Sequence, residues 1–185
     1  MSLLDIRVLG DPILRQETKP VTVMTDELRR LVDDMFETMH AAKGIGLAAP
    51  QVGRTERIAV VDVDKSPLVI VNPEIILANG PRERAEEGCL SIPDIFGEVE
   101  RPMNIVVRAL DRNGLPIEVP GADLLARCLQ HEIDHLHGKV FIDYLSLLKK
   151  KAAVRKWEDM KVKYPSLRRS LTAAEVAEHH NDDAL

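Results

Sequence analysis

The sequence is poor in aromatic residues and cysteine, and it lacks any long apolar run. Phe, Trp and Tyr make up only 3% of the 185 residues, so a core has to be built from Leu, Ile, Val, Ala and Met. Cys89 and Cys128 are too few for a disulfide framework. Each is therefore either a buried apolar residue or a thiolate with a chemical role. Since no segment approaches the ~20 apolar residues of a membrane-spanning helix, we expect no membrane partner.

Positive charge is not in excess either. Lys and Arg number 25 against 30 Asp and Glu, which gives a net charge of −5. A DNA-binding role is therefore not expected. The start, MSLLDIRVLGDP, lacks the basic segment and apolar run of a signal peptide, and Asp5, Asp11 and Glu17 fit a transit peptide poorly. We expect a cytoplasmic protein, although a processed organellar form would have the same sequence.

Apolar periodicity predicts an α+β fold. Thr25 is a candidate N-cap for a helix with one apolar stripe. Helices are expected over residues 25–44, 122–136 and 146–164. Strands are expected over residues 57–63, 68–72, 73–78, 103–110 and 115–119, with a hairpin turn at Asn113-Gly114. The order helix, strands, helices is typical of the α+β class.

The length allows one domain. We assign residues 1–165 to a single catalytic domain that includes the C-terminal helix. After Pro165 the apolar pattern weakens, so residues 166–185 are expected to form a mobile tail. Residues 44–53, rich in small side chains, are expected to form a turn or an extended loop.

The segment QHEIDHLHG, residues 130–138, carries the strongest chemical signal. On a helix, His131 and His135 lie on adjacent turns of one face, so both imidazoles can reach one metal ion. Glu132 lies beside them and can act on a metal-activated water as a general base. His137 projects away from this face and is expected on the surface. The pattern predicts a metal-dependent hydrolase if a third ligand exists.

The identity of the third ligand separates several classes of metalloprotein. A metzincin peptidase would need histidine at position 141, which is Phe141, so that class is excluded. A thermolysin-like zinc peptidase would take a downstream glutamate, for which Glu158 is the candidate. Cys89, in the segment EEGCLSIP, is the other candidate, since a thiolate is a good ligand for such an ion. A non-catalytic metal module would need a fourth protein ligand, and His40 or His137 would have to supply it.

Three segments together resemble the peptide deformylase family. GIGLAAPQ (44–51), EGCLS (87–91) and QHEIDH (130–135) occur in the order and approximate separation found in that family, and the similarity runs from Leu3 to Lys150. The C-terminal helix is similar to that of the bacterial type I branch. The resemblance implies antiparallel or mixed β-sheets packed around the HExxH helix, flanked by an N-terminal and a C-terminal helix.

The resemblance also implies the roles of the site residues. One divalent metal ion would be held by Cys89, His131 and His135, with Glu132 as the acid and base. The developing oxyanion would receive hydrogen bonds from the Gln51 side-chain amide and the Leu90 backbone N–H. The substrate methionine would be bound by Ile45, Gly46, Leu124 and Cys128, with its main chain added as a strand along residues 45–47.

The implied activity is hydrolysis of a linear amide in protein biosynthesis. Peptide deformylases remove formate from the N-terminal formyl-methionine of nascent chains, in bacteria or bacterially derived organelles. The resemblance implies Fe²⁺ in the cell, with Zn²⁺, Ni²⁺ or Co²⁺ in purified protein. For the basic helix at 146–164 a solvated face is the favoured interpretation, and a transient contact with the ribosome is the alternative.

Overall fold

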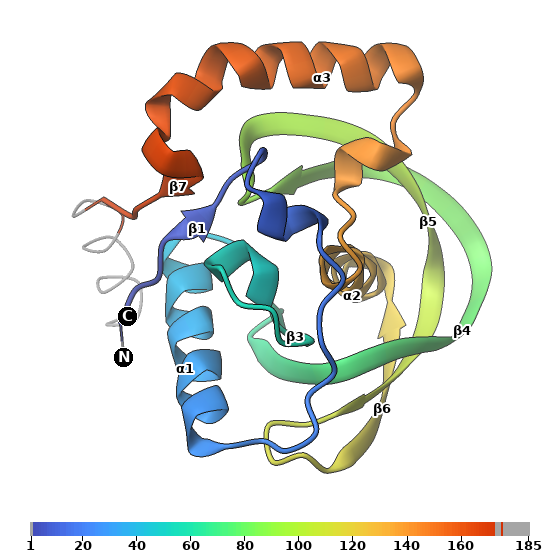
Figure 1. Cartoon of the computed structure of the whole chain (residues 1–185). Coiled ribbons are helices and arrows are strands. Elements are labelled where there is room, and N and C mark those ends of the chain that lie inside the picture. The colour runs from blue at the N-terminus through green and yellow to red at the C-terminus, as the bar shows by residue number, and fades with distance from the viewer. Residues whose placement is uncertain (1, 173–174, 176–185) are drawn as a thin grey trace.

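The HExxH helix lies at the centre of the fold. In a computed structural model, which describes residues 2–172 and 175, strands curve around helix α2 (Asp123–Leu136), seen nearly end-on in Figure 1. Helix α1 (Asp26–Ala41) covers one side of this arrangement, and helix α3 (Leu147–Met160) runs across one end. None of the described helices is long and apolar enough to cross a membrane.

Within the described residues the strands form one large sheet and one small sheet, and neighbouring strands in each sheet are antiparallel. The large sheet has the order β2-β3-β4-β5-β6, and β1 pairs with β7 in the small sheet. The strands are β1 (Ile6–Arg7), β2 (Gly46–Ala48), β3 (Ile58–Val63), β4 (Ser66–Cys89), β5 (Ile92–Leu110), β6 (Pro116–Ala122) and β7 (Arg168–Arg169). Short 3₁₀ helices span Pro12–Arg15, Ala49–Val52, Phe141–Tyr144, Lys161–Lys163 and Pro165–Leu167. The predicted α+β class is confirmed.

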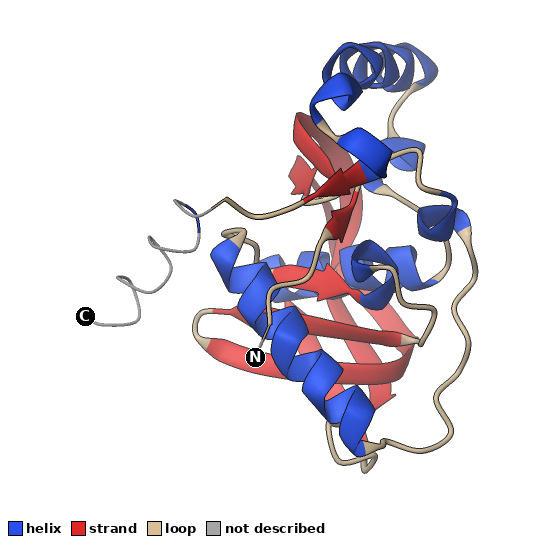
Figure 2. Ribbon diagram, turned by 60° about the vertical axis from the view of Figure 1, so that its left-hand side comes forward, coloured by secondary structure: helices blue, strands red, loops and turns tan. Residues whose placement is uncertain are grey.

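Sequence signals explain the helix boundaries. Thr25 accepts a hydrogen bond from the Leu28 backbone N–H and so caps α1, as predicted. The apolar stripe of α1 packs in one core cluster with residues of β2 and β3. Figure 2 shows α1 lying along the face of the sheet. Ser146 caps α3 in the same way, and Trp157 is the buried anchor of that helix.

Helix α2 divides its faces between core and site. Ala126, Leu129, Ile133 and Leu136 are buried in a second core cluster with residues of β3 and β5. Because side chains three and four positions apart share a helix face, the face formed by Cys128, His131, Glu132 and His135 is presented as a unit. The core packing therefore sets the orientation of the predicted site.

The longest strands differ from the prediction. Residues 68–72 and 73–78 are parts of one strand, β4, whose pairing with β5 shifts register between Val71 and Glu74. No strand was expected over residues 79–102, yet β4 and β5 continue through them as a long antiparallel arm. In β4 this stretch is exposed and charged, so it shows no apolar alternation, and pairing with β5 holds it extended.

The structure adds detail to two of the predicted loop regions. Residues 44–53 are extended and then turn, since Gly46–Ala48 pairs with β3 and Ala49–Val52 forms a 3₁₀ turn. Within the predicted tail, Arg168 and Arg169 pair with β1 near the N-terminus. The rest of the predicted tail, residues 173–174 and 176–185, lies outside the described residues.

Candidate active site

The predicted site residues meet at one large cleft of about 910 Å³. Its walls come from the loop before β2, the turn between β4 and β5, the exposed side of α2, and the segment after α3. Of the predicted residues, His135 is fully buried beside the cleft, and the following line it: Ile45, Gly46, Gln51, Cys89, Leu90, Leu124, Cys128, His131 and Glu132.

The side chains of Cys89, His131 and His135 converge where α2 faces the cleft. Their ligand atoms all lie within 4.8 Å of one another. His135 Nε2 is 3.2 Å from Cys89 Sγ and 3.2 Å from His131 Nε2. β4 ends at Cys89, and this end carries the thiol to the helix. A thiolate and two imidazoles suit a zinc-like or ferrous ion, and three protein ligands leave a coordination position open.

A buried acidic side chain orients one of these histidines. Glu87 Oε2 lies 3.2 Å from His131 Nδ1, which leaves Nε2 directed at Cys89 and His135. Burial disfavours the charge on Glu87, but hydrogen bonds from Arg101 and His131 outweigh it and lower the pKa of the carboxyl to about 2. The ionised Glu87 thus fixes the histidine in the orientation that a metal site requires.

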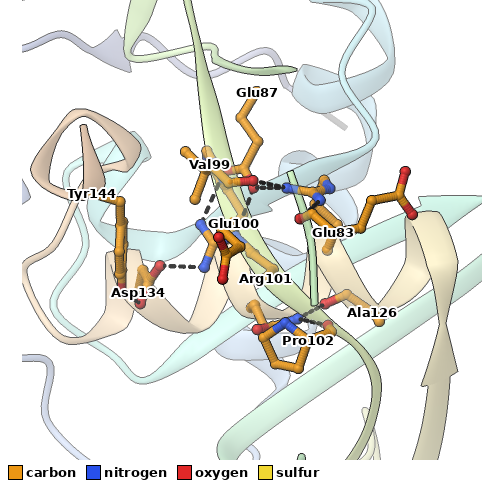
Figure 3. A network of polar contacts seen from close by, with 12 residues as sticks. Glu83, Glu87, Val99, Glu100, Arg101, Pro102, Ala126, Asp134 and Tyr144 are labelled. Carbon is orange, nitrogen blue, oxygen red and sulfur yellow. Dashed lines mark hydrogen bonds and ion pairs between the residues drawn. The ribbon is translucent and has the colours of Figure 1, made fainter. Parts of the chain in front are cut away.

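Glu87 belongs to a wider network that joins β4, β5 and α2. Arg101 donates to both Glu87 oxygens, at 2.6 and 2.9 Å, and to Asp134 at 2.8 Å. The Tyr144 hydroxyl donates to the other oxygen of Asp134 at 2.7 Å. Figure 3 shows Arg101 between Glu87 and Asp134, with Tyr144 beside Asp134. Arg127, on α2, also donates to Glu87, at 2.8 Å. Because these charges are paired and hydrogen-bonded, the arrangement is rigid.

Glu132 is a buried carboxylate with spare hydrogen-bonding capacity. Its side chain lines the cleft, and its Oε2 has no hydrogen-bond partner within residues 2–172 and 175. Burial raises the pKa of this carboxyl to about 7, against the opposing charges of His131 and Arg101. A carboxyl with a pKa near neutrality can both accept and return a proton at physiological pH.

Gln51 is held with its amide N–H directed at the thiol. Gln51 Oε1 accepts from the Ala48 backbone N–H at 2.8 Å. Its Nε2 then donates to Ser91 Oγ at 3.2 Å and toward Cys89 Sγ at 3.6 Å. Leu90 occupies the turn between β4 and β5, directly after Cys89. Both groups therefore stand next to the Cys/His/His cluster, as predicted.

The sequence matches the family model of polypeptide deformylases over residues 3–151. The chain belongs to the polypeptide deformylase family. It is 52% identical over 161 residues to the peptide deformylase of Hydrogenovibrio crunogenus, and the aligned region covers 85% of this chain and 95% of that relative. The chain therefore is a metal-dependent hydrolase that removes the formyl group from the N-terminal formyl-methionine of newly synthesised proteins.

Solved deformylase structures share the fold as well as the sequence. A peptide deformylase from Legionella pneumophila has 46% identity and a TM-score of 0.84, covering 89% of this chain and 99% of that one. A peptide deformylase from Ehrlichia chaffeensis in complex with actinonin has 42% identity and a TM-score of 0.84, covering 90% and 100%. The alternative of a zinc peptidase is thereby overturned.

The rival ligands lie elsewhere in this deformylase. Glu158 is on α3, where it is exposed and forms an ion pair with Lys161. His137 is exposed and pairs with Glu17, as expected for a surface residue. His40 pairs with Asp62. Among the described residues, the group that could hold a metal consists of Cys89, His131 and His135 alone.

The residues proposed for methionine binding form a mixed surface. Ile45 and Leu124 line the deformylase cleft with 42% and 51% of their surfaces exposed. Cys128 is buried, and its Sγ donates to the Ile45 backbone carbonyl at 3.4 Å. Burial, with the negative charges of Glu132 and Glu87, raises the pKa of the Cys128 thiol. Cys128 is therefore a neutral, apolar part of the wall.

Sequence reasoning missed the residues that orient His131. Glu87 lies two positions before Cys89 within the EGCLS segment, and both side chains reach the histidines of α2 although the register of β4 shifts between them. That spacing could have identified Glu87. Nothing in the sequence links Arg101 and Tyr144 to it, because they come from separate elements. Arg127 lines the cleft, and its guanidinium donates to Glu87 and to the Val99 and Glu83 backbone carbonyls.

Proposed function

We propose that Cys89, His131 and His135 hold one divalent metal ion and that Glu132 moves the protons of the formyl-amide hydrolysis. The convergence of the three ligand atoms within 4.8 Å supports the ligand set. The donor chemistry fits Fe²⁺ in the cell and Zn²⁺, Ni²⁺ or Co²⁺ in purified protein. When bound, such an ion supplies an acidified water and polarises the formyl carbonyl.

Glu132 is the group that accepts and returns the proton. Its buried carboxyl, with Oε2 unpaired among the described residues, is placed to take a proton from the attacking water. The same carboxyl then delivers that proton to the departing amine of methionine. The close approach of Glu132 to Gly46 holds the carboxylate against the cleft wall.

Gln51 and Leu90 are proposed to bind the developing oxyanion. The Gln51 amide is fixed by Ala48 on one side and Ser91 on the other, so its N–H does not need to reorganise during the reaction. The Leu90 backbone N–H, in the tight turn after Cys89, is the second donor. Preorganised donors of this kind contribute roughly 10²–10³-fold each to kcat.

The substrate is proposed to enter as an added strand beside β2. β2 is an edge strand of the five-stranded sheet, so its outer side is open to pairing with a peptide. In that position Ile45 and Gly46 would run beside the formyl-methionine main chain. Leu124 and Cys128, from α2, would contact its side chain.

We also propose the cellular setting of the enzyme. A single catalytic domain over residues 1–165 acts on N-formylmethionyl peptides in the cytoplasm of a bacterium. Helix α3 exposes Leu147, Leu148 and Lys151, a surface suited to a transient contact with the ribosome, while Lys149 and Lys150 pair with Glu98 and Asp143.

The substrate distinguishes this mechanism from peptide-bond cleavage. Metal-replete protein is expected to release formate from formyl-Met-Ala, and to leave acetyl-Met-Ala and an unblocked oligopeptide almost unchanged. An acetyl methyl has to fit where the formyl group presents only a hydrogen, beside Gln51 and Leu90. A displacement of about 1 Å costs roughly 10²-fold in such a site.

The assay measures formate, acetate and new amino termini. As a control, Glu158→Gln, on exposed α3, should release formate at the wild-type rate. Cleavage inside the oligopeptide with no formate from formyl-Met-Ala would overturn the proposal.

A further inference from the structure

The cleft is larger than a formyl-methionyl group requires. Its volume of about 910 Å³ lies near the upper end of the roughly 300–1,000 Å³ typical of pockets for drug-sized ligands. The cleft continues from the Cys89 cluster past Asp94 and Phe96 to residues between Lys163 and Glu175. Because the same cleft holds the catalytic residues, its far end can receive only the residues after methionine in the bound chain.

This far wall lies outside the region that matches the family. The family match ends at residue 151, whereas Lys163, Arg168, Ser170 and Thr172 all line the cleft. We call this wall, which follows the residues matched by the family model, the C-terminal wall.

The C-terminal wall is anchored to the body of the protein. Arg168 and Arg169 pair with Arg7 and Ile6 of β1, and Figure 1 shows β7 beside β1. The Ser170 hydroxyl donates to Asp5 Oδ1 at 2.6 Å. The ring of Tyr164, at the start of the wall, stacks on buried Trp157 with centroids 5.6 Å apart. A wall held at several points can present a fixed surface to a ligand.

Lys163 and Arg168 are exposed cations of this wall that make no ion pair within residues 2–172 and 175. Arg169 is neutralised by Glu175, at 2.6 Å. Arg168 is exposed and lines the cleft, and it makes no ion pair with any residue in the ranges 2–172 and 175. Its partner across the β1–β7 pair is Arg7, whose own charge is paired with Asp11, so β1 does not neutralise Arg168.

We propose that the C-terminal wall is a binding subsite for the residues that come after methionine in the nascent chain, and that Arg168 makes it favour acidic side chains there. The inference rests on the proposed function, since the occupant is the substrate itself. It assigns to residues beyond the family match a role in selecting which formylated chains are processed efficiently.

The test compares three amidated substrates at low salt. Formyl-Met-Ala-Asp-Asp-amide and formyl-Met-Ala-Lys-Lys-amide differ in charge after the second residue, and formyl-Met-Ala-amide has no charged side chain. The measured quantity is the ratio of kcat/KM for the acidic peptide to that for the basic one. Arg168→Glu should lower this ratio about fivefold, since attraction and repulsion exchange places. The change should shrink at 0.5 M salt, where the Debye length is only a few ångströms.

Arg155→Glu is the matched control. Arg155 is exposed on α3 and does not line the cleft, so this variant has the same net charge as Arg168→Glu. It should leave the ratio within twofold of wild type. An unchanged ratio in Arg168→Glu, or an equal change in both variants, would overturn the proposal.

Folding and basal activity are controlled separately. Arg168→Glu places opposite charges across the β1–β7 pair, so it should fold, and thermal unfolding checks this. Arg155→Glu should keep the wild-type kcat/KM for formyl-Met-Ala-amide. If the Arg168→Glu variant does not fold, Arg168→Gln provides the same test: it should lower the ratio about twofold, whereas Arg155→Gln should leave the ratio equal to that of wild type, and equal ratios in the two variants would overturn the proposal. Failure of the wild type to release formate from formyl-Met-Ala-amide would count against the proposed function instead.

Discussion

Replacing Gly46 by alanine should disable the enzyme without unfolding it. A Cβ atom at this position would lie 2.2 Å from Glu132 Oε1, 2.8 Å from Glu132 Cδ and 2.9 Å from Cys128 Sγ. Ordinary contact to a Cβ begins at 3.4 Å, so the Glu132 carboxylate has to move by about 1 Å. Gly46 was expected to lie beside the substrate main chain, which a side chain there would obstruct, and the contact with Glu132 is a second reason for its small size.

The size of the effect can be worked out from that displacement. A shift of about 1 Å in a catalytic group costs roughly 10²-fold in rate, or about 2.7 kcal/mol of transition-state stabilisation. Stability should change little. Gly46 lies in β2, where alanine suffers no backbone strain, and loss of glycine flexibility stabilises a protein by roughly 0.4–1 kcal/mol.

The assay is steady-state release of formate from formyl-Met-Ala, with metal content and thermal unfolding measured on the same preparation. Gly44→Ala, two residues earlier, is the matched control. An added Cβ at this position would lie 2.8 Å from Leu90 Cδ1, and the end of that leucine side chain can rotate away. That variant should keep activity within about threefold of wild type.

The kinetic constants separate the two explanations for glycine at position 46. Displacement of Glu132 lowers kcat, whereas obstruction of the substrate raises KM. A Gly46→Ala enzyme that retains full metal and a kcat within threefold of wild type would refute the reasoning about Glu132.

Three further predictions concern single side chains. Cys89→Ser should lose most of the bound metal, because a hydroxyl is a poorer anionic donor than a thiolate, while Cys128→Ser should keep it; elemental analysis of both variants checks this. Glu132→Gln should keep the metal and lose roughly 10²–10⁴-fold in kcat, and loss of metal along with activity would mean that Glu132 has another role. For Asp143, burial opposes ionisation, but the ion pair with Arg15 lowers its pKa from 3.8 to about 2. A carboxyl with a lowered pKa stabilises the fold above pH 3.8, and this stabilisation is lost as the pH falls through 2. In urea unfolding at pH 6, the free energy of unfolding of wild type should exceed that of Asp143→Asn by at most about 2 kcal/mol. This difference should disappear between pH 4 and 2.

Local patterns were sufficient for the helices and for part of the site. The 3.6-residue period and the Thr25 cap predicted α1, and the same period put His131, Glu132 and His135 on one face of α2. These features depend on residues close together in the chain, so they can be read from spacing alone. The choice of Cys89 over Glu158 came from the likeness of three segments to a family, since spacing alone left both ligands open.

The long arm formed by β4 and β5 could not be read from the sequence. Its residues between 79 and 102 are held extended by pairing with one another, and in β4 their side chains are mostly exposed and charged. An apolar period exists only where one face of a strand is buried. The strand that delivers Cys89 to α2 therefore shows no alternation over much of its length.

The supports of the site depend on tertiary structure for the same reason. Glu87, Arg101 and Asp134 come from β4, β5 and α2, and only the packing of these elements brings their charges into one buried network. The C-terminal wall closes the cleft because Arg168 and Arg169 pair with β1, at the opposite end of the chain. Contacts between residues so far apart leave no periodic trace in either segment, so no local pattern predicts them.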